Sequence, residues 1–380
     1  MIRITDENRS NCCGCTACKS VCPKQAISML PDQEGFLTPV IDSSLCINCG
    51  LCDKVCPMAH SDKLESKCHD NVYVGALKDL QELSKSQSGG AFWALAKAVI
   101  QNEGIVYGCG YKGHFVAAHK RAETIEQCEE FRKSKYVQSD MGDCYMQIQE
   151  DLQAGRNVLF SGTPCQCAGL QSFLGKKYEN LIVCDIICHG VPTPLLTEKY
   201  IAECEKQYGD KIVGFNYRYY DGVSLIWGRY LEKIDFSKGD SILATKLSNL
   251  YYSSAFLRKS CNICPFGNKA TSDVTIADAW GCKNYAPGIE NTNRGVSEIL
   301  IHSKIEQIYG MLASSMNLVR VNYGDVSKYQ PSLFKPTEAS RNREKYMKMF
   351  LKKGILYTHK RMTQRARVKD MLLKLIGKNK

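Results

Sequence analysis

Residues 11–23 read NCCGCTACKSVCP, and residues 45–57 read LCINCGLCDKVCP. Each stretch spaces four cysteines as C-x2-C-x2-C-x3-C and places a proline directly after the last one. The two runs begin 34 residues apart and account for eight of the nine cysteines found before residue 60. A repeat of this kind indicates a small first domain, which we place at residues 1–60.

The spacing is typical of thiolates that bind [4Fe–4S] clusters, with the fourth cysteine of each run serving the other cluster. We therefore assign the eight cysteines to two clusters, one held by Cys12, Cys15, Cys18 and Cys56, the other by Cys46, Cys49, Cys52 and Cys22. Structural zinc sites use C-x2-C pairs with longer spacers, so zinc is the weaker interpretation. Cys13 is an extra thiol, and we predict that it is a bystander.

The chain has 380 residues and 21 cysteines, and the compartment decides what these thiols can do. Its first residues, MIRITDENRS, lack the pattern of a secretory signal, and no apolar run is long enough to span a membrane. We therefore expect a cytoplasmic protein that uses its thiols for metal binding or redox chemistry rather than for disulfides.

The formal net charge of +11 belongs to one end of the chain. Residues 341–380 hold 14 of the 50 Lys and Arg but 2 of the 39 Asp and Glu, so the body is close to neutral. This distribution argues against a nucleic-acid partner. A basic amphipathic helix predicted at residues 361–376 suits an anionic membrane surface or an acidic partner such as ferredoxin, and a solvated terminal helix is the alternative.

Apolar runs alternate with helix-like stretches from Tyr73 onward, which is typical of an α/β layer architecture with buried strands. We expect helices at residues 89–101, 143–152, 166–174 and 193–207. We expect strands at residues 104–107, 115–118, 157–160, 181–187, 211–218, 230–236 and 296–301. The polar segment 60–67 is predicted to be a linker.

Three motifs in this body could hold ligands. Residues 86–90 (SQSGG) precede a predicted helix, whose N-terminus favours a phosphate, although an ordinary N-cap explains them too. Residues 161–166 (SGTPCQ) join a strand to a helix at the sheet edge where α/β folds bind ligands. Residues 132–136 (RKSKY) could contact a flavin ring or a substrate anion, or form a solvated helix end.

Five further cysteines are candidates for a third cluster: Cys165, Cys184, Cys188, Cys261 and Cys264. A third [4Fe–4S] cluster could take four of them. The alternative is a zinc or redox pair at Cys261 and Cys264 with buried structural thiols elsewhere.

Several motifs occur in a fixed order: SQSGG (86–90), SKY (134–136), SGTPCQ (161–166), CDIICHGVP (184–192), CNICPF (261–266) and ADAWG (277–281). Together they resemble the beta-subunit family of coenzyme F420 hydrogenases and dehydrogenases, fused to an N-terminal dicluster ferredoxin. The resemblance covers roughly residues 1–300. The family often has GDFWG where this chain reads ADAWG, so the substrate here is expected to differ.

The resemblance implies an α+β or α/β fold: a dicluster ferredoxin-like domain, an α/β FAD-binding region in two parts (70–190 and 191–330) and a basic helical tail (331–380). It implies FAD contacts at Ser88, Gly89, Gly90, Ser134, Lys135, Tyr136, Gly162 and Thr163. It places the third cluster at Cys165, Cys188, Cys261 and Cys264, with Cys184 in reserve.

The expected activity is that of an iron–sulfur flavoprotein oxidoreductase. Electrons would pass between a ferredoxin or other redox protein, the clusters, FAD and a small molecule or F420-like carrier, with His189 and Tyr136 as proton donors. Some relatives are encoded beside surface-polysaccharide genes, so polysaccharide biosynthesis is one expected setting. The alternatives are an electron-transfer subunit without its own substrate and a zinc-stabilised scaffold.

Overall fold

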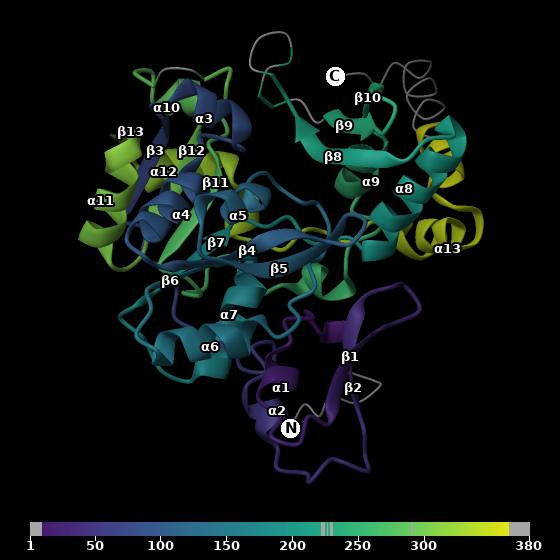
Figure 1. The fold of residues 1–380 in the computed structure, drawn as a ribbon, viewed down its shortest axis with the longest axis horizontal. Coiled ribbons are helices and arrows are strands. Elements are labelled where there is room, and N and C mark those ends of the chain that lie inside the picture. Colours follow the sequence, from purple (N-terminus) through teal and green to yellow (C-terminus); the bar gives the residue numbers. More distant parts are fainter. Residues whose placement is uncertain (1–9, 222–224, 226, 229–230, 290–291, 365–380) are drawn as a thin grey trace.

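A computed structural model describes residues 10–221, 225, 227–228, 231–289 and 292–364 (Figure 1). Its centre is an eight-stranded mixed sheet. In spatial order the strands are β13 (Met316–Arg320), β3 (Asn71–Leu77), β12 (Ser297–Ile301), β11 (Val274–Asp278), β7 (Leu181–Ile186), β6 (Val158–Gly162), β4 (Ile105–Lys112) and β5 (Val116–Ala122).

Parallel pairing in the middle of the sheet decides where loops can converge. Strand β6 pairs in parallel with β4 and β7, and β7 pairs in parallel with β11. The carboxyl ends of these strands therefore open at one edge of the sheet, the place where such sheets bind ligands. Strand β12 runs antiparallel to β11, so its first residue, Ser297, reaches the same edge.

Helices cover both faces of this sheet (Figure 1). One face packs on α4 (Ala91–Gln101) and α11 (Ile305–Ser315), and the other on α6 (Cys144–Gln153) and α7 (Pro164–Leu174). Side chains alternate along each strand, so Leu159 joins the first core while Val158 and Phe160 join the second. The α/β layer prediction is confirmed.

A smaller three-stranded antiparallel sheet forms a second unit from β8 (Ile212–Tyr219), β9 (Leu231–Phe236) and β10 (Ser241–Ala244). It shares one hydrophobic core with α8 (Pro194–Tyr208), α9 (Lys246–Tyr252) and α13 (Arg343–Lys353). Tyr346, Met347 and Phe350 of α13 are buried in that core. The first part of the predicted tail is therefore a docked helix.

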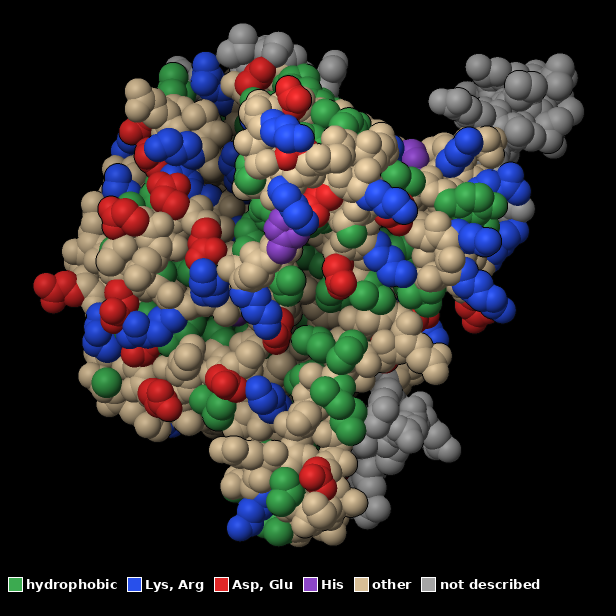
Figure 2. Space-filling view, turned by 45° about the vertical axis from the view of Figure 1, so that its right-hand side comes forward, with side chains coloured by type: hydrophobic (Ala, Val, Ile, Leu, Met, Phe, Trp, Pro, Cys, Tyr) green, Lys and Arg blue, Asp and Glu red, His purple; other side chains and the backbone are tan. Residues whose placement is uncertain are grey.

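The basic side chains of this region lie on its outer side. Lys345, Lys348, Lys352 and Lys353 of α13 are exposed. Figure 2 shows Lys and Arg side chains gathered on this side of the molecule. Residues 355–364 are also helical, whereas most of the predicted amphipathic helix at 361–376 lies outside the described residues.

The N-terminal region folds as a small unit around the two cysteine runs. Its elements are α1 (Ala17–Ser20), α2 (Leu51–Lys54) and an antiparallel hairpin of β1 (Ile27–Pro31) and β2 (Leu37–Ile41). The runs repeat each other's backbone, because Gly14 and Asn48 both have positive φ (71° and 55°), as do Thr16 and Gly50 (71° and 73°). The internal repeat predicted from the spacing is thus present in the conformation.

The segment predicted as a polar linker is ordered against the body. Residues 61–63 form a 3-10 turn, and Ser66 makes a β-bridge with Lys269. The Lys67 ammonium lies 2.8 Å from Oδ2 of Asp185, with 1% and 0% of the two side chains exposed. The linker prediction is wrong for the end of the segment, because Lys67 is buried against Asp185. Nothing in the sequence indicates this contact, since the two residues are 118 positions apart.

Each predicted helix and strand is present, with ends that differ from the prediction by a few residues. For the strand predicted at 230–236, residue 230 lies outside the described residues. The remaining short elements are η2 (Ser61–Lys63), α3 (Leu80–Lys85), α5 (Ile125–Cys128), η3 (Glu129–Phe131), η4 (Lys259–Ile263), α10 (Cys282–Tyr285), α12 (Tyr323–Val326), η5 (Ser327–Tyr329) and η6 (Pro331–Leu333). Within the described residues, no helix has the length and apolar character needed to cross a membrane.

Candidate functional site

The first cysteine group brings Cys12, Cys15 and Cys18 together with Cys56 from the other run. Burial, and then the neighbouring thiols of Cys12 and Cys56, raise the pKa of Cys18. Burial raises the pKa of Cys56, and the Cys12 thiol raises it further. Charge interactions of this kind act over short distances. Cys56, the fourth cysteine of the second run, therefore lies beside the first run, as the predicted exchange of ligands requires.

The second group lies toward the outside of the molecule. Burial raises the pKa of Cys52, with smaller contributions from Asp53 and Cys49. Cys49 is exposed, and its neighbours Leu45 and Ile47 are 51% and 58% exposed. Cys22 Sγ accepts a hydrogen bond of 3.3 Å from the Ala26 amide.

The first group faces the body instead. Cys13, Cys15, Ala17 and Val55 are buried in the core that α6 and α7 form beneath the large sheet. Contact with α7 is so close that a Cβ added to Gly169 would lie 2.8 Å from Cys15 Cβ. The N-terminal unit is therefore docked through the residues that surround its first cysteine group.

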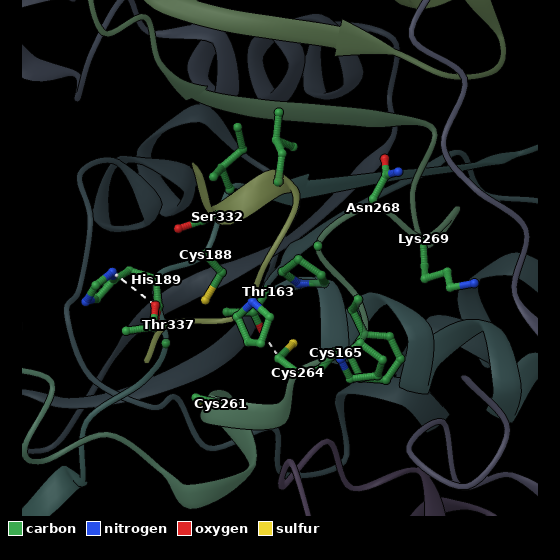
Figure 3. A pocket seen from close by; sticks show the side chains of 18 of the residues that line it. Thr163, Cys165, Cys188, His189, Cys261, Cys264, Asn268, Lys269, Ser332 and Thr337 are labelled. Atoms are coloured by element: carbon green, nitrogen blue, oxygen red, sulfur yellow. Dashed lines mark hydrogen bonds between the residues drawn. The ribbon is translucent and has the colours of Figure 1, made fainter. Parts of the chain in front are cut away.

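A cavity of about 170 Å³ lies next to this junction and is lined by Cys165, Cys188, Cys261 and Cys264 (Figure 3). Cys165 is in the first turn of α7, Cys188 follows β7, and the other two belong to η4 and the residue after it. Four cysteines predicted as ligands thus meet from three parts of the chain.

The positions of two other cysteines differ from those predicted. Cys184, the predicted reserve, points away from this cavity into the core beneath α4. Cys13, the predicted bystander, lines the cavity. Within the described residues, no three His, Cys, Asp or Glu side chains converge closely enough for a single metal ion.

Two of the four sulfurs have polar neighbours. Thr163 Oγ1 lies 3.2 Å from Cys165 Sγ, and the Val191 amide donates to Cys261 Sγ at 3.4 Å. Hydrogen bonds to ligand sulfurs are a regular feature of iron–sulfur sites.

A second cavity, of about 480 Å³, opens at the carboxyl edge of the sheet. All but one of the residues predicted to contact FAD line it: Ser88, Gly90, Ser134, Lys135, Tyr136, Gly162 and Thr163. The exception, Gly89, packs beneath the turn, where its amide donates to Ser297 Oγ at 2.9 Å. Motifs that lie far apart in the sequence therefore form one wall.

The polar groups of this cavity have distinct roles. The Lys135 ammonium donates to the carbonyl groups of Glu130, Arg132 and Lys133, so it holds its own loop, and burial lowers its pKa to about 8. The Gln87 side-chain amide lines the cavity, and neither its nitrogen nor its oxygen has a hydrogen-bond partner within the described part of the chain. A buried amide without partners favours a polar ligand at this place.

The rings of His189 and Tyr136, the predicted proton donors, both lie next to the ring of Tyr251. The Tyr251 ring centre is 4.7 Å from that of Tyr136 and 5.4 Å from that of His189. The His189 ring contacts Ser254 Oγ and Thr337 Oγ1, each at 3.2 Å, and burial lowers its pKa. Both residues line the larger cavity.

The ADAWG motif also reaches this cavity, in a role that the sequence did not reveal. Asp278 ends β11 and accepts hydrogen bonds from Ser88 Oγ, from Arg218 at 2.6 Å and from Trp227 Nε1 at 3.1 Å. The Trp227 and Trp280 rings stack 4.9 Å apart. Asp278 thus ties the Ser88 turn to an aromatic wall.

The two cavities share a wall. Thr163, Ser332 and residues 186–191 line both. Cys188 and His189 lie within this shared segment, so one side of the loop after β7 faces the cysteines and the other faces the larger cavity.

Comparisons with known proteins agree with the motifs. Residues 11–59 match the family model described as a 4Fe-4S dicluster domain. Residues 155–317 match the model described as the C terminus of the coenzyme F420 hydrogenase/dehydrogenase beta subunit. No curated protein matches the chain significantly in sequence.

One chain of the F420-reducing [NiFe] hydrogenase complex from Methanosarcina barkeri is similar in structure, with a TM-score of 0.44 and 14% identity. The match covers 80% of this chain and 93% of that one.

Proposed function

We propose that this chain, which joins a 4Fe-4S dicluster domain to a domain of the coenzyme F420 hydrogenase/dehydrogenase beta-subunit family, is an iron–sulfur flavoprotein oxidoreductase. It would pass electrons between iron–sulfur clusters, FAD and a two-electron carrier or substrate. The observation that carries this proposal is the wall shared by the cysteine-lined cavity and the larger cavity.

The chemistry of the first cavity fits a third [4Fe–4S] cluster. Cys165, Cys188, Cys261 and Cys264 would hold it, and the eight cysteines of the two runs would hold the others. Thiolates are the ligands that such clusters use, and the four sulfurs surround one space rather than pairing off. Clusters bound there would supply one-electron transfer.

The larger cavity fits a flavin. Its volume of about 480 Å³ lies in the range of cofactor pockets, and its lining is largely apolar with a few convergent polar groups. Among the described residues the Gln87 amide has no hydrogen-bond partner, and α4, which begins at Ala91, would bring the positive end of its helix dipole to a phosphate at this wall. FAD bound there would supply two-electron chemistry.

The residues of the chain would position this group and exclude water. Trp280 and Tyr136 form apolar walls, and the contact of Asp278 with Ser88 fixes the turn that faces the cavity. Burial lowers the pKa of His189 and so favours its neutral ring, which would take up and return a proton beside the bound group. The Tyr136 hydroxyl, on the same cavity wall, would be a second proton donor.

The exposed surface of the N-terminal unit indicates the kind of protein partner. The exposed surface around Cys49 suits a ferredoxin or another redox protein, since one-electron carriers dock close to a cluster. We propose a small molecule or an F420-like carrier as the two-electron partner, with surface-polysaccharide biosynthesis as a setting still to be tested. An electron-transfer subunit would instead turn over only within a complex.

A cavity-filling variant tests the flavin site. Ser134→Phe would place a ring in the larger cavity, and Ser84→Phe at the exposed end of α3 is the matched control. We expect Ser134→Phe to lose most of the bound FAD, measured by absorbance and chromatography, while both variants keep their iron. Equal FAD content in the two variants would contradict this assignment.

A further inference from the structure

Cys13 connects two cysteine groups that the sequence treats as separate. It is 8% exposed and lines the cavity formed by Cys165, Cys188, Cys261 and Cys264. It also follows Cys12 directly and packs in the same core as Cys15. Cys13 therefore lies between the first cysteine run and the cavity.

The backbone around Cys13 is held rigidly in this position. Arg258 donates from Nε to the Cys12 carbonyl at 2.7 Å, and Ser260 Oγ donates to the same oxygen at 2.9 Å. Gln138 Nε2 donates to the Cys13 carbonyl at 3.0 Å and is itself held by Arg258 at 2.7 Å. The clamp thus comes from Arg258 and Ser260, shortly before Cys261, and from Gln138.

Gly14 completes this arrangement. Its φ of 71° suits glycine, and a Cβ there would lie 2.5 Å from Gln138 Nε2 and 2.6 Å from an Arg258 nitrogen. The position of Cys13 is therefore fixed by close packing on both sides of the junction.

We propose that Cys13 is a positioning and tuning residue rather than a bystander: a free thiol that stays unligated and shares its S–H between the ligand sulfurs of the first and third clusters. A thiol is a weak hydrogen-bond donor, and hydrogen bonds to cluster sulfurs raise the reduction potential because they stabilise the more negative, reduced state. This inference rests on the proposed third cluster.

The position of this sulfur is not that of an ordinary core thiol. Cys13 belongs to the apolar core that contains Cys15, and it also lines the cavity together with four other cysteines. Five thiols thus line a cavity where a cluster needs four, and the fifth belongs to the neighbouring cysteine run.

The test uses the anaerobically purified full chain in four forms: wild type, Cys13→Ala, Cys13→Ser and, as the control, Cys128→Ala, which removes a buried thiol from the other face of the sheet. Iron content and the midpoint potentials of all clusters, followed by electron paramagnetic resonance, are the readouts. For Cys13→Ala we expect unchanged iron and at least one cluster whose reduced-to-oxidised ratio falls about fivefold at a fixed potential, the effect of losing one modest hydrogen bond.

The outcomes separate the alternatives. Cys13→Ser should keep most of the effect of the thiol, because a hydroxyl also donates. Loss of about four iron atoms in Cys13→Ala would show that Cys13 is a ligand and would overturn the proposal, as would potentials equal to those of Cys128→Ala. A wild-type protein with only two clusters would instead refute the proposed third cluster itself.

Discussion

The ammonium of Lys67 lies 2.8 Å from a carboxylate oxygen of Asp185, and neither side chain is more than 1% exposed. The pair joins the segment after the dicluster domain to the central strand β7, across 118 residues. Thr275 Oγ1 completes it by accepting from Lys67 at 2.8 Å and donating to Asp185 at 2.5 Å. A buried ion pair so enclosed fixes the connection between the dicluster domain and the large sheet.

Lys67→Met should therefore destabilise the protein strongly, because Asp185 would keep a buried charge without its partner. We expect a loss of about 3–5 kcal/mol in the free energy of unfolding, measured with urea. Lys63→Met, at an exposed position four residues earlier, should change it by about 0.5 kcal/mol or less.

The double variant Lys67→Met/Asp185→Leu provides the check. Replacing both charges by apolar groups should recover much of the lost stability. Equal unfolding curves for Lys67→Met and Lys63→Met would contradict the role assigned to the pair.

Gly14→Ala should weaken the docking of the dicluster domain. The alanine would meet both a left-handed backbone (φ 71°) and the side chains of Gln138 and Arg258. Gly50→Ala is the matched control, since Gly50 has φ 73° but open space around it. Both variants should lose about 1–2 kcal/mol from backbone strain, and Gly14→Ala about 2 kcal/mol more.

Urea unfolding and limited proteolysis after the dicluster domain measure this difference. Faster cleavage near residues 60–66 in Gly14→Ala than in Gly50→Ala is the expected result. The docking described above would be contradicted if the two variants behaved alike.

A half-buried histidine that lines the larger cavity predicts a loss of stability in acid. Burial lowers the pKa of His119 from 6.5 to about 4, and its ring contacts Ser161 O at 3.0 Å and Ser139 Oγ at 2.9 Å. Because the unfolded chain binds the proton more tightly, the contribution of His119 is complete above pH 6.5 and disappears as the pH falls through 4.

The measurement is the free energy of unfolding between pH 7 and pH 5, the part of this window that is accessible to the holoprotein. His119→Gln should reduce the slope by up to about 1.4 kcal/mol per pH unit, the effect of one proton. His302, whose pKa is also lowered to about 4 by burial, should leave part of the acid dependence in place. An unchanged slope in His119→Gln would show that the ring is not buried in a neutral state.

Truncations separate the docked part of the C-terminal region from the rest. A chain that ends at residue 364 keeps Arg343, which forms a two-pronged ion pair with Glu34 at 2.9 and 2.5 Å, and the buried face of α13. A chain that ends at residue 342 loses both and uncovers the core of the smaller sheet.

We expect the chain 1–364 to fold with full iron content and the chain 1–342 to aggregate. Co-sedimentation of 1–364 and the full chain with anionic vesicles then tests whether residues 365–380 bind a membrane surface. Folding of 1–342 with unchanged stability would contradict the docked position of α13.

Much of this architecture could be predicted because it depends on local patterns. The two cysteine runs fix the ligand types and their repeat, and the alternation of apolar strands with helices places residues 161–166 and 184–192 at one sheet edge. Since the ends of parallel neighbours meet, Gly162, Thr163 and Cys188 come together as the strand order requires.

The remaining features depend on contacts between distant residues. Nothing near Cys13 in the sequence shows that Arg258 and Gln138 hold its backbone, and nothing near Lys67 indicates Asp185. The many lysines in and around α13 likewise suggest a solvated helix, although one face of α13 is buried in the core of the smaller sheet. Such pairings arise from tertiary packing, for which single-sequence patterns carry no signal.

A reductive titration of the anaerobically purified chain tests the central claim most directly, with iron and flavin determined in the same sample. Three clusters and one FAD in electronic contact predict about twelve iron atoms, one FAD and an uptake of about five electrons per chain, with flavin and cluster absorbance bleaching in one titration. A protein that contains zinc instead of iron, or iron without flavin and an uptake of no more than about two electrons, would contradict it.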